Sequence, residues 1–167
     1  ESTSLLSLYL KQINVYTKKI VGYQGSDHMR ASANIKALKM ALKVNRAPKI
    51  HHSDRGSQYI YKDYISVLKS NGCSISMANT AQDNAYAERI NRTIKNDYVE
   101  HWKPKSFNQL KRMVKKAVNQ YNTVRPHNHI GKISPMEFEN RFRMKRTFHP
   151  KSITIFNDEI NIKNGQL

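Results

Sequence analysis

Residues 51 to 59 read HHSDRGSQY, and Asp54 within them decides how the middle of the chain is interpreted. We expect residues 49 to 52 to form a short strand, so that Asp54 lies just past its carboxyl end. Acidic residues are scarce, with 12 Asp and Glu against 29 Lys and Arg. A carboxylate at a strand end is therefore a candidate site residue, although a lone aspartate before Arg55 and Gly56 also commonly stabilises a turn.

Strands and helices alternate around this stretch. Residues 5 to 10 and 18 to 23 are predicted to form an antiparallel hairpin, because two apolar runs flank a short polar connection. Beyond it we expect a helix that starts near Ser26 or Asp27, the strand before Asp54, a helix over residues 58 to 71 that ends at Gly72, and a strand over 73 to 77. This order indicates an α/β sheet with parallel strands, in which ligands gather at the carboxyl ends. The predicted buried stripes are Ala31, Ile35, Leu38 and Leu42 in the first helix, and Tyr61, Tyr64, Ile65 and Leu68 in the second.

The next segment, AQDNAYAERINRTIKNDY at 81 to 98, is predicted to be helical from about Asn84. Glu88, Arg92 and Lys95 then fall at i, i+4 and i+7 on the side opposite the apolar residues. One interpretation is a surface ladder of ion pairs, which stabilises an exposed helix modestly. The other is a metal-binding carboxylate flanked by cations that hold a phosphate backbone.

The formal net charge of +17 at pH 7 favours a polyanionic partner, and nucleic acid fits best. A solvated surface, a ribosomal role and a membrane-surface role are the alternatives. The chain has no signal peptide and no apolar run of membrane-spanning length, which predicts a cytoplasmic protein. Its one cysteine, Cys73, excludes an internal disulfide and is expected to be a small core residue.

Basic residues continue toward the C-terminus. Ser106 and Gln109 form a possible capping box for a helix that buries one apolar side and exposes four cations, either to solvent or to phosphates. Arg125, in an extended turn, is predicted either to contact DNA or to anchor the fold. Ser134 followed by Pro135 predicts another helix start. The buried residues expected in the first of these helices are Leu110, Met113, Ala117, Val118 and Tyr121, and the four cations are Lys111, Arg112, Lys115 and Lys116.

Four blocks in order carry a family resemblance: INVYTKKIVGYQGSDHMR at 13 to 30, HSDRGSQY at 52 to 59, DNAYAERINRTIKNDY at 83 to 98, and YNTVRPHNHIGKISPMEFE at 121 to 139. They resemble bacterial insertion-sequence transposases with a retroviral-integrase-type catalytic core. The resemblance covers roughly residues 5 to 140. It implies a ribonuclease H-like mixed sheet flanked by helices, with a helical C-terminal extension.

The resemblance also implies a chemistry. The family holds two divalent cations, usually Mg²⁺ and otherwise Mn²⁺, with three carboxylates in the order Asp, Asp, Glu. Asp54 resembles the second Asp and Glu88 the Glu, so both are predicted catalytic and metal-binding residues. Arg92, Lys95 and Arg125 are the predicted DNA contacts. The family's first Asp lies on a central strand just before the hairpin, where residues 1 to 10 offer only Glu1. The resemblance therefore predicts a core that is incomplete at the N-terminus and lacks its first strand.

The predicted domains are an integrase-type core over residues 1–142 and a basic tail over 143–167, with a possible strand near 153 to 156. The predicted function is metal-dependent phosphodiester cleavage and strand transfer by a DDE transposase. The absent first Asp leaves open whether this chain is an active enzyme, and a catalytically dead DNA-binding remnant is the alternative. A ribonuclease for RNA–DNA hybrids would share the fold but not the blocks at 52 to 59 and 121 to 139. DNA is the expected partner, with no membrane contact, a homo-oligomer when assembled on DNA, and a location at the bacterial nucleoid.

Overall fold

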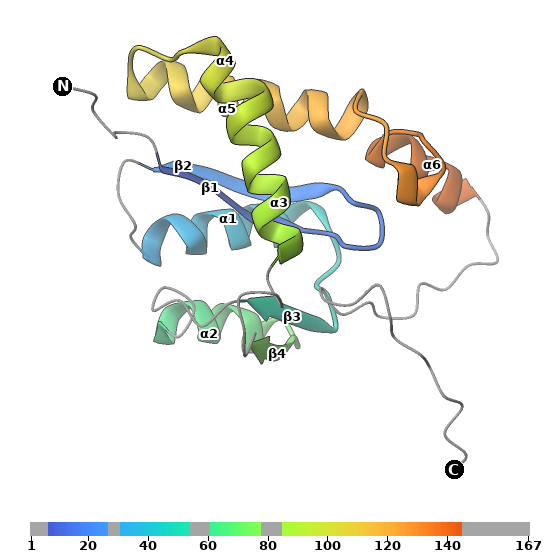
Figure 1. The fold of residues 1–167 in the computed structure, drawn as a ribbon. Coiled ribbons are helices and arrows are strands. Elements are labelled where there is room, and N and C mark those ends of the chain that lie inside the picture. Colours follow the sequence, from blue (N-terminus) through green and yellow to red (C-terminus); the bar gives the residue numbers. More distant parts are fainter. Residues whose placement is uncertain (1–6, 27–30, 54–60, 78–84, 145–167) are drawn as a thin grey trace.

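The computed structural model of the protein describes residues 7–26, 31–53, 61–77 and 85–144. Four short strands and a set of helices alternate along the chain, and the hairpin of the first two strands lies between α1 and α5 (Figure 1). The elements are β1 (Ser7–Ile13), β2 (Ile20–Ser26), α1 (Ala31–Val44), β3 (Ile50–Ser53), α2 (Lys62–Ser70), β4 (Ser74–Met77), α3 (Ala85–Ile94), the π-helix η2 (Lys95–Val99), α4 (Glu100–Trp102), α5 (Phe107–Thr123), the 3-10 helix η3 (Asn128–Ile130) and α6 (Pro135–Met144).

The strands form two pairs of the predicted kinds. β1 and β2 are antiparallel, and β3 and β4 are parallel with Ser53 opposite Met77. Within the described ranges these pairs are two separate two-stranded sheets, so β1 and β3 each keep one edge without a strand partner there. The resemblance implies a single mixed sheet with a central strand between the two pairs. In the described residues the two pairs are present as separate sheets.

The hairpin strands extend farther along the chain than predicted. Register shifts occur between Leu10 and Gln12 and between Gln12 and Ile13, and Gln12 and Ile13 are both buried. This irregularity breaks the alternation of buried and exposed residues, so the sequence pattern stops near Leu10 although the strand continues. Asn14 closes the turn, because its Oδ1 accepts hydrogen bonds from the backbone N–H groups of two following residues, at 3.0 and 3.1 Å.

The packing face of α1 is rotated from the predicted stripe. Leu38 is buried as expected, but Ile35 and Leu42 are only partly buried. The helix packs against the hairpin through small side chains and reaches α2 through the larger ones. Gly22 of β2 allows this approach, since a Cβ there would lie 2.2 Å from the backbone oxygen of Ala37. The most buried residues of α1 are Ala33, Asn34, Ala37, Leu38 and Ala41.

Two hydrophobic clusters fill the interior. The larger one joins the hairpin to α3, η2 and α5. The smaller one joins Leu38 to Tyr64 and Leu68 of α2 and to Cys73, which confirms the predicted core role of the cysteine. The prediction for Tyr61 is wrong: it precedes the first residue of α2 and is 56% exposed. The larger cluster consists of Ile13, Ile20, Ile90, Ile94, Val99, Leu110, Val114, Ala117, Val118 and Tyr121.

The predicted helix boundaries hold where a cap or a glycine sets them. Gly72 has φ +71 just past α2, a backbone conformation that suits glycine at a helix end. Ser106 Oγ accepts the backbone N–H of Gln109 at 3.2 Å at the start of α5, and Ser134 Oγ accepts that of Glu137 at 3.2 Å at the start of α6.

One prediction for α5 is wrong, and two others lie wholly or partly outside the described residues. In α5 the buried position is Val114, whereas Met113 is only partly covered. Ser26 is the last residue of β2, and Asp27 lies outside the described residues. The tail strand predicted near residues 153 to 156 also lies outside them.

Candidate active site

The parallel strands β3 and β4 end beside each other, directly before the predicted site residue Asp54. The two strands are parallel and end together, at Ser53 and Met77. Asp54 is the next residue after β3 and lies outside the described residues. Ligands of α/β sheets gather at such carboxyl ends. The predicted strand before Asp54 is confirmed as β3.

Glu88 lies in the first turn of α3 and is exposed. Its carboxylate has neither a hydrogen bond nor an ion pair with any residue of the described ranges, and the ladder with Arg92 is not formed. Asp63, exposed in the first turn of α2, is the only other described acid in this condition. The remaining four are paired: Asp97 with Arg125, Glu100 with Lys95, Glu137 with Arg141, and Glu139 with Lys19 and Arg143.

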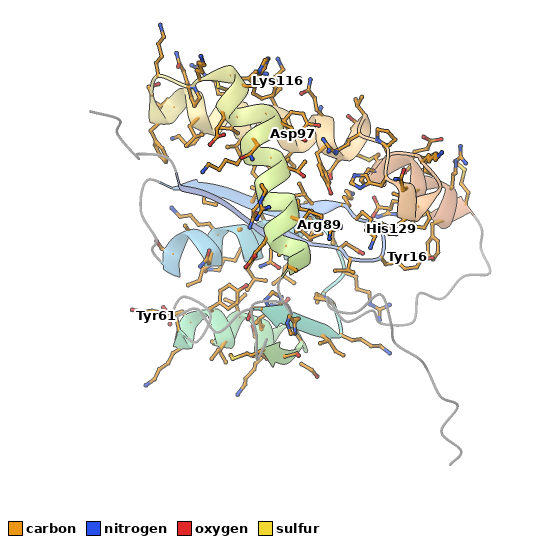
Figure 2. The ribbon with its side chains drawn as sticks, viewed as in Figure 1. Tyr16, Tyr61, Arg89, Asp97, Lys116 and His129 are labelled. Carbon is orange, nitrogen blue, oxygen red and sulfur yellow. The ribbon has the colours of Figure 1, made fainter. Side chains whose placement is uncertain are left out.

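Two exposed cations follow Glu88 on α3. Arg92 is exposed on the same helix, one turn after Glu88. Arg89, whose side chain is labelled on α3 in Figure 2, is also exposed and was not selected by the i, i+4, i+7 pattern. Asn91 buries its Oδ1 without a hydrogen-bond partner among the described residues. Asn91 lies at i+3 from Glu88, a spacing that places both on one side of a helix.

A π-helical turn alters the phase of this helix after Ile94. The sequence predicted a regular helix to Tyr98, but Lys95–Val99 form η2, whose backbone bonds join residues five apart. Lys95 consequently lies next to Glu100, with Nζ 3.4 Å from Oε1. Both side chains are more than half exposed, so this pair stabilises the helix little and Lys95 stays accessible.

Arg125 links the chain after α5 to η2. Its Nη1 donates to Asp97 Oδ2 at 2.8 Å. Burial by itself would lower the pKa of Arg125, but its hydrogen bonds to Tyr98 and Asp97 and the negative charge of Asp97 outweigh this and raise it. Arg125 is thus a permanent cation with one face on η2, which agrees with an anchoring role.

A buried chain of hydrogen bonds lies directly before Asp54. Gln12 Nε2 donates to the Tyr64 hydroxyl at 2.9 Å, and that hydroxyl lies 3.1 Å from His51 Nε2. It connects β1 of one sheet to β3 of the other through Tyr64 of α2. Burial first, and the charge of neighbouring His52 second, lower the pKa of His51 to about 4. His51 is therefore neutral near pH 7, and the network fixes the end of β3.

Two models of the integrase core domain match the chain, one over residues 9–82 and the other over residues 71–135. Together they run without a break from residue 9 to residue 135 and include both Asp54 and Glu88. The chain belongs to the integrase core family.

Curated relatives of this integrase core come from bacterial insertion elements, which confirms the predicted family. It is 36% identical over 141 residues to the 31 kDa protein of insertion element IS600 of Shigella sonnei, covering 81% of this chain and 52% of the relative. It is 33% identical over 135 residues to the transposase for insertion sequence element IS629 of Shigella sonnei, covering 78% and 45%. The chain thus spans about half the length of the curated relatives it matches.

Solved structures share the fold of this integrase core. The HTLV-2 integrase catalytic core domain in complex with magnesium superimposes with a TM-score of 0.63 at 14% identity, covering 80% of this chain and 90% of that chain. The catalytic core domain of BIV integrase gives a TM-score of 0.62 at 15% identity, covering 84% and 95%. The predicted ribonuclease H-like fold class is confirmed.

The described part of the integrase core holds no group of three His, Cys, Asp or Glu side chains that could bind a metal ion. A site at the β3–β4 edge would combine Glu88 with Asp54, whose position lies outside that part. Both supply the hard oxygen donors that Mg²⁺ and Mn²⁺ prefer, and Glu88 has no ion pair with a cation of the described ranges. Two carboxylates are ligands of the kind that a divalent metal takes, but by themselves they do not complete a Mg²⁺ site. Across the same ranges, no helix combines the length and the apolar character that crossing a bilayer demands.

Proposed function

We propose that this integrase core is the catalytic core of a DNA transposase, which cleaves phosphodiester bonds and joins DNA ends. Asp54 and Glu88 are the residues that would hold the metal. The family membership and the fold support this activity, and the chain's match to about half of each relative makes the activity of the whole protein part of the proposal.

One observation carries the assignment of Glu88. In a protein of formal charge +17, this exposed carboxylate has no ion pair within the described ranges, although Arg92 stands four residues away. A surface ladder would use that arginine, because Glu four residues before a cation is the favourable order. A carboxylate without a partner in the described ranges is instead available to a metal ion.

Divalent metal would supply the Lewis-acid chemistry of phosphoryl transfer, in which charge on the attacking and leaving oxygens is stabilised. The chain's own part is to hold the carboxylates in place. The Gln12–Tyr64–His51 chain fixes the end of β3, and the anchored η2 fixes the helix that carries Glu88. Such support keeps site residues positioned for reaction.

DNA would lie across the exposed side of α3. Arg92 and Lys95, with Arg89 beside them, would contact phosphates, while Arg125 would do so only with the part of its side chain that Asp97 leaves accessible. We further propose that the protein forms a homo-oligomer on DNA, as the simian T-cell lymphotropic virus intasome neighbour is an assembly. Its working location would be the cytoplasm, at the nucleoid.

The alternative is a DNA-binding remnant without catalysis. Residues 1 to 30 contain two acids, Glu1 and Asp27, and neither matches the family's first Asp. Two carboxylates make a weak Mg²⁺ site, since this ion gives up its waters reluctantly.

The test measures joining of DNA ends with Mg²⁺ or Mn²⁺. We expect residues 1–167 alone to be inactive, and the same residues preceded by a strand that carries an aspartate to be active. Asp54→Asn or Glu88→Gln should then abolish joining. Asp63→Asn is the matched control, because Asp63 is the other exposed, unpaired acid among the described residues and lies on α2.

Activity that survives Glu88→Gln would refute the assignment of Glu88. An inactive extended chain that still binds DNA would favour the remnant. Joining by residues 1–167 alone, lost on Glu88→Gln, would mean that another residue supplies the third ligand.

A further inference from the structure

A second basic surface lies away from Glu88, on α5 and the loop before it. The 36 residues from 101 to 136 contain no Asp or Glu. Six cations in the first half of this stretch are exposed, and none has an ion pair with a described residue. We call them the α5 cationic surface: Lys103, Lys105, Lys111, Arg112, Lys115 and Lys116.

The free charge of this surface contrasts with α6. There Arg141 and Arg143 are each paired with a glutamate four residues earlier, the usual arrangement of a solvated helix face. The cations of α5 have no such partners, so their charge is available to an external anion.

The four cations on α5 itself form one band. They stand at i, i+1, i+4 and i+5, whereas Leu110, Val114 and Ala117 of the same helix are buried. Equivalent positions one turn apart are separated by roughly 6 Å along the axis. The band therefore presents a row of charges, and its opposite side is fixed in the core.

Two of the lysines are held against aromatic rings. Lys111 Nζ lies 4.9 Å from the centroid of Phe107, and Lys116 Nζ lies 4.9 Å from that of Trp102. Cation–π contacts restrict these flexible side chains while leaving the ammonium groups exposed. Less conformational entropy is then lost when they bind a phosphate.

The surface is far from the candidate active site. Glu88 lies in the first turn of α3 and Trp102 at the end of α4, fourteen residues later on the helical path α3–η2–α4 (Figure 1). At 1.5 Å per residue this is roughly 20 Å. Figure 2 shows Lys116 at the top of the view and Arg89 on the lower half of α3. The phosphates that this surface contacts would not be those at Glu88.

We infer that the α5 cationic surface binds the phosphate backbone of a second segment of duplex DNA, separate from the segment that reacts. The inference rests on the proposed function for the first segment. A row of unpaired cations without acids matches a phosphate backbone, whose binding releases counterions. A membrane surface fits less well, because α5 buries its apolar side instead of offering it to lipid.

The test compares two variants that lose four charges each. One replaces Lys111, Arg112, Lys115 and Lys116 by Gln. The matched control replaces Lys36, Lys39, Lys43 and Arg46 by Gln; these are exposed cations on and after α1, whose surface also exposes Met40 and Val44. Binding of the 167-residue chain to a fluorescent 30-base-pair duplex is measured from 50 to 300 mM NaCl, with thermal unfolding to verify that both variants are folded.

The plot of log K against log salt should become shallower by about 0.9 for each phosphate that the variant no longer neutralises, so by about 3 to 4 in the α5 variant, with affinity at least about tenfold weaker at 100 mM NaCl. The control should keep its slope within about 1 of the unmodified chain. Equal losses in both variants, or no loss in the α5 variant, would overturn the inference.

Two further arms separate the partner classes and the two proposals. Tighter binding to an RNA duplex of equal length, or to vesicles of phosphatidylglycerol and phosphatidylcholine, with the same loss in the α5 variant, would also overturn the inference. Asp63→Asn, at an exposed acid of α2, should bind the DNA duplex with an unchanged slope. Absence of DNA joining with unchanged DNA binding would count against the proposed function. An unchanged salt slope in the α5 variant would count against the second DNA segment.

Discussion

Acid should destabilise this protein through His51, which has 2% of its surface exposed. The folded pKa of His51 is lowered to about 4 from 6.5, so the unfolded chain takes up a proton below pH 6.5 and the folded chain resists until about pH 4. The neutral imidazole therefore contributes its full stability above pH 6.5, and that contribution is lost as the pH falls from 6.5 toward 4. A difference of 2.5 pKa units is worth about 3 kcal/mol, of which about 2 kcal/mol is lost by pH 5.

The assay is urea unfolding of the chain and of His51→Gln at pH 7 and pH 5. Glutamine can accept a hydrogen bond from the Tyr64 hydroxyl and does not titrate. The free energy of unfolding of the unmodified chain, relative to that of His51→Gln, should therefore fall by about 2 kcal/mol at the lower pH. The comparison with a variant is needed because burial first, and then the charges of Arg125, Lys18 and His129, also lower the pKa of His127. His101→Gln, at an exposed histidine of α4, controls for the substitution itself. If the difference between His51→Gln and the unmodified chain were the same at both pH values, the reasoning would be wrong.

Two stability predictions follow from close packing of the hairpin. Gly22→Ala should lower the free energy of unfolding by about 1 to 3 kcal/mol, since its Cβ would meet the Ala37 backbone at 2.2 Å; Gly25→Ala, whose nearest such contact is 3.6 Å, should change it by about 0.5 kcal/mol at most. Equal effects in urea unfolding would contradict the tight approach of α1. Asn122→Ala should cost about 1 to 3 kcal/mol for each of two buried hydrogen bonds, because Asn122 pairs with both the N–H and the C=O of Ile20 at 2.9 Å. Asn119→Ala, at an exposed position of α5, should change the free energy of unfolding by about 0.5 kcal/mol at most, and equal losses would contradict the reasoning.

Sequence patterns were most reliable where one residue type decides the local geometry. Caps at Ser106 and Ser134, a glycine after α2 and the apolar positions Leu38, Tyr64 and Leu68 were all predicted, because each follows from local periodicity or backbone chemistry. The parallel pairing of β3 and β4 was also predicted, from the helix that connects them.

Features that depend on partners distant in the chain were not predicted. The π-turn at Lys95–Val99 is held by Arg125, which lies 28 residues beyond Asp97, and no helical pattern reveals such a contact. The burial of alanines in α1 depends on Gly22 of another element. For the site, sequence selected Glu88 but could not tell a ladder from a free carboxylate. The roles of all five predicted site residues stay predictions: Asp54, Glu88, Arg92, Lys95 and Arg125.

The double hydrogen bond between Asn122 and Ile20 also has a consequence for synthesis of the chain. The backbone groups of Ile20 at the start of β2 are paired by a side chain that is translated 102 residues later. At about 5 to 20 residues per second, the ribosome needs roughly 5 to 20 s to add that distance. During this interval the nascent hairpin carries an unsatisfied backbone position next to an open strand edge, which is the kind of surface that pairs with other chains. The Ile20 backbone of the hairpin therefore gains its side-chain partner only after α5 has been synthesised.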